Sequence, residues 1–297
     1  CPPPPLRLLP RAGPSLALAG CPLPPRGGYL WSLVDFLGPG FLGSQRGLQT
    51  RYRGPLAKGG DEDRQQQLVQ RVRPFLLRRT KDEVAPELPP KTEINEVVEM
   101  ADAQRAIYEG IRLSMHARVK AAIAEKGLAR SGIIVLDALL KLRQACCDPR
   151  LIKLKAVERS KAGSAKLDRL MEMLTVMLEE GRKVLLFSQF TEMLGLIEAR
   201  LKEEGTSYVL LTGDTKDRAT PVRKFQKGDV PPFLISLNAG GVGLNLAAAA
   251  TVIIYDPWLN PAFEDQATAL PHRPGQEQKV VLQRLDTTGS RAGAPGT

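Results

Sequence analysis

The fold is decided by residues 183–256, KVLLFSQFTEMLGLIEARLKEEGTSYVLLTGDTKDRATPVRKFQKGDVPPFLISLNAGGVGLNLAAAATVIIYD, in which short apolar runs alternate with helical patterns. The runs are uninterrupted and rich in Leu or β-branched residues, as in strands that are buried on both faces. They are KVLLFSQ at 183–189, YVLLTG at 208–213, FLISL at 233–237 and TVIIYD at 251–256, with VVLQRL at 280–285 as a fifth. This alternation predicts an α/β domain with a mainly parallel sheet.

Upstream of this domain the apolar pattern is helical. An amphipathic helix is expected within residues 61–80, and a longer one over 102–126, where apolar residues recur every fourth position. A further helix is expected over about 133–146, and Ser164 is predicted as the N-cap of the helix AKLDRLMEMLTVMLEE. Residues 1–28 are dominated by Pro, Gly and Leu, so little stable structure is expected there.

The composition sets the class of protein. A length of 297 residues corresponds to two domains at about 150 residues each. With 43% hydrophobic and 25% charged residues, the chain is neither collagen-like, mucin-like nor wholly disordered. It contains no apolar run of membrane-spanning length, and CPPPPLRLLP at the start is not expected to act as a signal peptide, because it lacks a continuous apolar stretch. The four cysteines lack the spacing of a metal site or a disulfide framework, which predicts a reducing compartment.

The net charge of +10 is concentrated in two segments. Residues 1–60 and 101–160 each carry +6, residues 61–100 carry −2, and the remainder is neutral. The second basic segment has a helical pattern and could lie on a phosphate backbone, although a solvated helix face explains the same charges equally well. Its basic residues include Arg105, Arg112, Arg118, Lys120, Lys126 and Arg130.

Ligands of such sheets bind beyond the carboxyl ends of the strands, so the strand exits are the place to look for chemistry. FLISL is followed by NAGGVGLNL at 238–246, whose glycines let backbone amides approach a phosphate without obstruction by Cβ atoms. A tight turn from strand to helix explains these glycines equally well. TVIIYD is followed by PWLNPAFEDQATALPHRPGQ at 257–276, which carries Arg273.

In this order, the stretches closely resemble the second RecA-like lobe of the Swi/Snf-type helicase-like ATPases. LFSQF at 186–190 resembles helicase motif IV, LTGDT at 211–215 the block after it, SLNAGGVGLNL at 236–246 motif V, and residues 255–276 the stretch that ends in motif VI. Upstream, LWSLVDFLGPGFLG at 30–43, RPFLLRRTKDEVAPELPPKTE at 73–93 and LLKLRQACCDPRLI at 139–152 are similar to the link between the family's two lobes and to its helical segment.

The resemblance implies an α/β fold in which a RecA-like parallel sheet lobe, the helicase C-terminal domain, is preceded by a helical segment and a remnant of the first lobe. The expected division is 1–92 for the remnant and the inter-lobe link, with a disordered N-terminal part, 93–162 for the helical segment, and 163–297 for a truncated C-terminal lobe. Because the chain begins with Cys rather than Met, we expect a piece of a longer reading frame or a processed product.

The resemblance also implies a function, which is ATP hydrolysis coupled to movement along double-stranded DNA, with ATP and magnesium as cofactors. Arg273 matches the arginine that stabilises charge on the transferred phosphoryl group. By the same resemblance, the residues expected to bind ATP and couple it to DNA are Gly240, Gly241, Gly243, Asn245 and Gln266. The residues expected to contact the DNA backbone are Ser188, Gln189, Thr212, Gly213 and Ser236. The implied compartment is the cytoplasm of a bacterium or the nucleus of a eukaryote, with no membrane partner.

The sequence departs from the family at the nucleotide site. It contains neither G-x-x-x-x-G-K-[ST] nor an acidic box of the D-E-A-H type, so the first lobe's nucleotide site is missing and no metal site is expected. Leu270 and Ala269 replace the family's Arg and Asp, and Pro271 should break the helix just before His272. We therefore expect the chain alone to hydrolyse ATP no faster than background, although its family is one of hydrolases.

Two other functions stay open. The chain could be a non-catalytic DNA-binding module that uses its basic helical segment. It could instead complete an ATPase in trans with a separate first-lobe chain, through apolar surface around Trp31, Phe36 and Phe41.

Overall fold

The computed structural model describes residues 28–54, 61–77, 79, 83, 85, 88–153, 157, 162–228, 230–240, 244, 246–257, 261–273 and 278–288. The chain divides into two compact units, residues 1–86 and residues 87–297, each of which is described by itself. Every helix within the described ranges is too short or too polar to cross a membrane.

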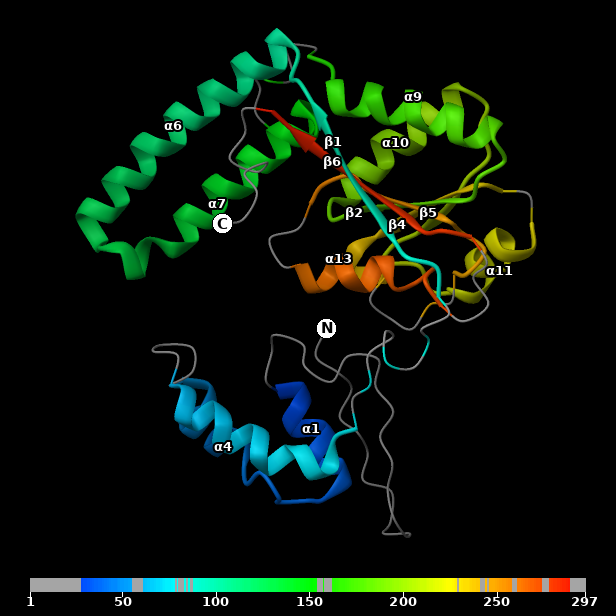
Figure 1. Cartoon of the computed structure of the whole chain (residues 1–297). Helices are drawn as coiled ribbons and strands as arrows, with labels where there is room; N and C mark the ends of the chain where they lie inside the picture. The colour runs from blue at the N-terminus through cyan, green and yellow to red at the C-terminus, as the bar shows by residue number, and fades with distance from the viewer. Residues whose placement is uncertain are drawn as a thin grey trace. The chain divides into compact units, whose positions relative to one another are not determined.

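The unit of residues 87–297 is built on a six-stranded sheet in the order β1-β6-β5-β2-β4-β3, and all neighbouring strands are parallel (Figure 1). This confirms the predicted α/β fold and all five predicted strands. The strands are β1 (Thr92–Val98), β2 (Val184–Ser188), β3 (Val209–Leu211), β4 (Pro232–Ser236), β5 (Thr251–Ile254) and β6 (Val281–Thr287).

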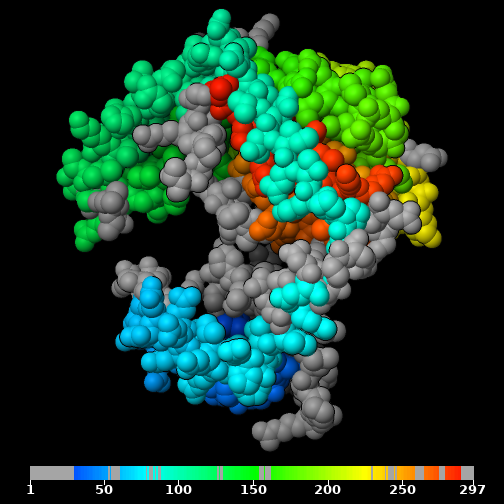
Figure 2. Space-filling model, in the orientation of Figure 1, coloured from blue at the N-terminus to red at the C-terminus, as the bar shows by residue number. Residues whose placement is uncertain are grey.

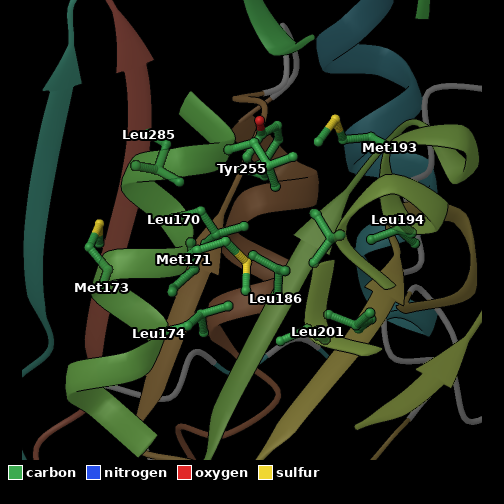
Figure 3. Close-up of a cluster of buried hydrophobic side chains, with 14 of the residues drawn as sticks. Leu170, Met171, Met173, Leu174, Leu186, Met193, Leu194, Leu201, Tyr255 and Leu285 are labelled. Atoms are coloured by element: carbon green, nitrogen blue, oxygen red, sulfur yellow. The ribbon is translucent and has the colours of Figure 1, made fainter. Parts of the chain in front are cut away.

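Helices cover both faces of the sheet, which is why the central strands are apolar throughout. Every residue of β2, β4 and β5 is buried. On one face, Leu186 of β2 lies in a core cluster with Leu170 of α9 (Ala165–Glu179) and Leu194 of α10 (Thr191–Glu203) (Figure 3). Its neighbour Leu185 belongs to the core on the opposite face, with α11 (Ala219–Lys227), α12 (Leu237–Gly240) and α13 (Pro261–Thr268).

The strand β1 was not predicted. It pairs along its whole length with β6, from Thr92 opposite Val281 to Val98 opposite Thr287, and the two strands lie side by side at the surface (Figure 2). Most of its side chains are exposed, so its sequence TEINEVV lacks the continuous apolar run of a central strand. The division at residues 92/93 and 162/163 stays a prediction, and the structure adds that β1 belongs to the sheet.

Two long helices, α6 (Asp102–Lys126) and α7 (Leu128–Cys147), form an antiparallel hairpin that extends away from the sheet (Figure 1). The first helix has the predicted bounds, whereas the second begins earlier than the expected start near Ile133. Gly127 makes the turn with φ of 74°, and the Ser131 hydroxyl donates to the carbonyl oxygen of Ala122. A 3-10 turn, η3 (Pro149–Leu151), follows the hairpin.

The unit of residues 1–86 contains α1 (Gly28–Leu37), α2 (Gln45–Leu48), η1 (Gln49–Arg53), α4 (Glu62–Val72) and η2 (Arg73–Phe75). The helix α4 confirms the amphipathic helix predicted within 61–80. Residues 28–54 contain α1, α2 and η1, with a turn between α1 and α2. The expected disorder of the N-terminal part falls on residues 1–27, which lie outside the described residues. The Trp31 indole donates to the carbonyl oxygen of Gly43 at 2.8 Å, and Phe41 meets Phe75 edge to face.

Candidate functional site

The carboxyl ends of the strands meet at one edge of the sheet because all six strands are parallel. Ser188 at the end of β2 lies opposite Ser236 at the end of β4, and Leu211 at the end of β3 lies opposite Ile235. Five residues predicted from the sequence therefore lie at this edge, which we call the carboxyl edge: Ser188, Gln189, Thr212, Gly213 and Ser236.

The two serines of the carboxyl edge are buried, with exposed fractions of 0% for Ser188 and 2% for Ser236. The Ser188 hydroxyl oxygen accepts from the backbone N–H of Phe190 at 3.1 Å and so shapes the turn after β2. Ser236 Oγ and Gln189 Nε2 are also buried, and neither has a hydrogen-bond partner among the described residues. Two buried donors thus stand unsatisfied at the ends of neighbouring strands, which is costly unless a ligand or water accepts from them.

The turn after β3 is the accessible part of this edge. The Thr212 N–H donates to Thr215 Oγ1 at 3.0 Å, and the Thr215 N–H donates back to the Thr212 carbonyl oxygen at 3.2 Å. Gly213 is exposed at the tip of this turn, and Thr212 is partly exposed. The geometry therefore presents a hydroxyl and a glycine backbone to solvent, a surface suited to phosphate oxygens.

A buried carboxylate fixes the exit of β2. Asp256, two residues after β5, accepts from the Gln189 N–H with Oδ2 at 3.0 Å and Oδ1 at 3.2 Å. Burial raises the pKa of Asp256 from its ordinary 3.8 to about 6. The exits of β2 and β5 are thereby joined by a charge that is expensive to bury.

Two buried or partly buried cations join the same network. Lys166 Nζ donates to the carbonyl oxygen of Tyr255 at 3.1 Å, and Arg143 Nη2 donates to that of Pro257 at 2.6 Å. The Tyr255 hydroxyl donates to the carbonyl oxygen of Cys147 at 3.0 Å. Sequence reasoning missed these residues, because each contact joins segments 89 to 114 positions apart and no local spacing signals it.

The predicted glycine loop is described only in part. Gly240 ends α12, which follows β4 directly, whereas Gly241, Gly243 and Asn245 lie outside the described residues. The helix α12 packs against α13, which carries the partly buried Gln266.

Arg273 lies beyond the end of α13. That helix ends at Thr268, before His272 as predicted, but three residues before Pro271, the residue expected to break it. Leu270, in the place of a family arginine, is only 2% exposed and packs into the core on that face of the sheet. Arg273 is partly exposed, and its guanidinium has neither a hydrogen bond nor an ion pair among the described residues.

The structure places Arg273 at the opposite edge of the sheet. The neighbouring His272 has Nε2 at 2.9 Å from the carbonyl oxygen of Pro89, three residues before β1 begins. There the Thr92 N–H donates to the carbonyl oxygen of Val280, so this is the amino end of both β1 and β6. Arg273 thus lies at the amino edge and the five residues named above lie at the carboxyl edge, and α13 runs between the two edges.

The described residues differ in how well they suit the implied cofactors. The unpaired guanidinium of Arg273 suits a nucleotide phosphate. Among the same residues, no group of three or more His, Cys, Asp or Glu side chains is arranged to hold a metal ion.

Two family profiles match the chain: the SNF2-related domain over residues 12–151 and the helicase conserved C-terminal domain over residues 165–275. The chain is 39% identical to the putative ATP-dependent helicase/translocase YwqA of Bacillus subtilis, over 93% of this chain and 30% of that protein. It is 32% identical to the probable ATP-dependent DNA helicase CHR23 of Arabidopsis thaliana, over 93% of this chain and 27% of that protein. It spans less than a third of the length of these relatives.

Solved structures show the same likeness. The Sulfolobus solfataricus SWI2/SNF2 ATPase core in complex with dsDNA aligns with a TM-score of 0.56 and 34% identity, over 89% of this chain and 55% of that chain. The C-terminal part of the Fun30 ATPase domain aligns with a TM-score of 0.57 over 68% of this chain and 87% of that chain. At 24% identity, the second alignment supports the fold alone.

Proposed function

The chain belongs to the Swi/Snf-type family of helicase-like ATPases, and from this premise we propose that it supplies the second-lobe side of a motor that hydrolyses ATP to move along double-stranded DNA. The observation that carries the proposal is that Arg273 lies at one edge of the sheet and the five predicted DNA-contact residues lie at the other, with α13 between the two edges. Such a lobe presents one edge to DNA and the other to a nucleotide.

The carboxyl edge is the proposed DNA-binding side. The unsatisfied donors of Gln189 and Ser236, together with the exposed turn at Thr212 and Gly213, offer hydrogen bonds to phosphate oxygens. Ser188 supports this edge by shaping the turn after β2. Hydroxyls and amides in this arrangement grip the backbone without reading bases, as a motor indifferent to sequence requires.

Arg273 is the proposed catalytic residue. Its guanidinium would stabilise the charge on the transferred phosphoryl group of ATP, the cofactor whose cleavage drives the motor. The glycine loop at Gly240, Gly241, Gly243 and Asn245, with Gln266 on α13, would couple that site to the carboxyl edge. No cluster of His, Cys, Asp or Glu side chains among the described residues would hold a metal ion. The residues that would bind magnesium, which would neutralise phosphate charge, are therefore assigned to a first lobe.

The chain alone should not hydrolyse ATP above background. Its sequence lacks the Walker lysine motif, and the side chain in place of a second motif VI arginine is the buried Leu270. Mixing the chain with a first lobe made separately, such as that of the Sulfolobus solfataricus ATPase core, tests the trans arrangement. DNA-stimulated hydrolysis should then appear and fall by about a thousandfold with Arg273→Ala, as for other lost arginine fingers.

The control is Arg182→Ala, which removes an exposed arginine paired with Glu180 and should leave hydrolysis unchanged. Hydrolysis by the chain alone that survives repurification and is abolished by Arg273→Ala would contradict the proposal.

A DNA-binding module without catalysis is the second candidate, favoured by the charge of the α6–α7 hairpin. Residues 102–147 carry eight Lys and Arg against four Asp and Glu, and Lys120 and Arg130 are exposed. This function predicts salt-dependent binding to double-stranded DNA and no ATP hydrolysis with any added first lobe.

A further inference from the structure

Lys166, the second residue of α9, is buried in an unusual way for a lysine. It is only 4% exposed, whereas lysine side chains are almost never buried unless they are paired. Among the described residues its ammonium makes no salt bridge. It donates instead to the peptide carbonyl of Tyr255 at 3.1 Å and lies 5.5 Å from the centre of the Tyr255 ring. The buried ammonium group of Lys166 thus has the Tyr255 carbonyl oxygen as its hydrogen-bond acceptor.

That carbonyl lies where β5 leaves the sheet, and the exit is held from other sides as well. The Tyr255 N–H donates to the carbonyl oxygen of Phe187 at 3.0 Å, and the Tyr255 hydroxyl reaches Cys147 at the end of α7. The next residue, Asp256, accepts from the Gln189 N–H with both carboxylate oxygens. The path of the chain at Tyr255 therefore determines the path at Gln189.

We propose that Lys166 is a positioning residue for the carboxyl edge: by holding the Tyr255 carbonyl it sets Asp256, and through Asp256 it sets the backbone at Gln189. The functional meaning of this role rests on the proposed binding of DNA at that edge. The role itself is a property of the fold and can be measured without DNA.

A purely structural role makes a different prediction. Met is similar in length and fills the same volume, but it supplies no donor to the Tyr255 carbonyl oxygen, so some stability is lost in either case. A purely structural role predicts that the whole sheet opens more easily, whereas positioning predicts that the exits of β5 and β2 loosen more than the rest of the sheet.

The experiment uses the full chain and three variants. Lys166→Met removes the donor, Lys166→Arg keeps a cationic donor, and Lys153→Met is the control because it also removes one positive charge, from a side chain 79% exposed. Exchange of the Gln189 amide hydrogen is followed by NMR, and unfolding by urea reports stability. Affinity for a fluorescent DNA duplex of random sequence is measured in parallel.

We expect Lys166→Met to speed exchange at Gln189 by about tenfold more than exchange at the other sheet amides, as expected when one hydrogen bond to a charged group is lost at this exit. DNA affinity should fall more than in Lys153→Met, and Lys166→Arg should restore both readouts. Unchanged exchange at Gln189 would overturn the proposal. Equal acceleration of all sheet amides, at Gln189 and elsewhere, would also overturn it, because Lys166 would then only stabilise the unit.

Two further outcomes can be distinguished from a failure of the positioning role. If Lys166→Met does not fold, Lys166→Gln, which keeps a neutral donor, is measured in the same way and decides between the same results. If the wild-type chain does not bind the duplex while exchange at Gln189 responds as expected, the positioning role stands and the proposed DNA-binding function fails.

Discussion

Replacing Asp256 by Asn should change how the stability of the unit of residues 87–297 depends on pH. Burial raises the pKa of Asp256 from 3.8 to about 6, so the native state binds this proton more tightly than the unfolded chain does. The protonated carboxyl therefore stabilises the native state fully below about pH 4, and this contribution is lost as the pH rises through 6. A difference of about 2 pKa units corresponds to about 3 kcal/mol.

The assay is urea unfolding of the wild type and of Asp256→Asn between pH 4.5 and 7.5, which isolates this one group from the other carboxylates. With Trp31 replaced by Phe, fluorescence reports on Trp258, which follows Asp256 closely in the sequence. On going from pH 7.5 to 4.5, the wild type should gain about 2 kcal/mol relative to Asp256→Asn, since the titration is incomplete at the acid end.

The control is Asp217→Asn. Hydrogen bonds from Thr220 lower the pKa of Asp217, so its contribution is present above about pH 4 and lost as the pH falls. The difference between wild type and Asp217→Asn should show no rise toward acid pH. If the difference between wild type and Asp256→Asn is also flat, the carboxylate at the exit of β5 does not titrate as a buried group, and the reasoning about this network fails.

Three other changes have predictable effects on the free energy of unfolding. Lys183 Nζ donates to three carbonyl oxygens at the end of α11, so Lys183→Met should lower stability by about 1–2 kcal/mol in urea unfolding. Ser164 caps α9, as predicted, and Ser164→Ala should cost about 1 kcal/mol and speed amide exchange in the first turn of that helix. Arg284→Met leaves the buried carboxylate of Glu264 without this partner and should cost about 3 kcal/mol, whereas Glu264→Gln combined with it should recover part of the loss.

The elements that the sequence predicts best are those buried on both sides. The strands β2, β4 and β5 are apolar throughout because helices cover both faces of the sheet, and such runs stand out in the sequence. The strand β1 escapes the same reasoning. Its partner β6 lies about 190 residues away, and its charged residues are balanced by side-chain contacts, Glu93 with Arg284 and Glu96 with Arg169.

The loop residues of the candidate site can be predicted from the sequence, but the buried residues that hold those loops in place cannot. Ser188, Gln189 and Ser236 follow apolar strands, and a parallel sheet must bring such exits together. Lys166 and Asp256 give no comparable signal, because one resembles a polar position on an amphipathic helix and the other a residue in a turn. Only the packing of α9 against the exit of β5 shows that both are buried.

The placement of Arg273 has a consequence for how a nucleotide could influence the sheet. The segment from Asp256 to Arg273 is anchored at its start by the bonds of Asp256 to Gln189, in its middle by the contact of Glu264 with Arg284, and at its end by the contact of His272 with Pro89. Within the described residues 261–273, the chain is thus held at Glu264 and at His272. Movement of Arg273 toward a phosphate should therefore strain the contact of His272 with Pro89 and the contact of Glu264 with Arg284, and so act on α13 and on the amino end of β1.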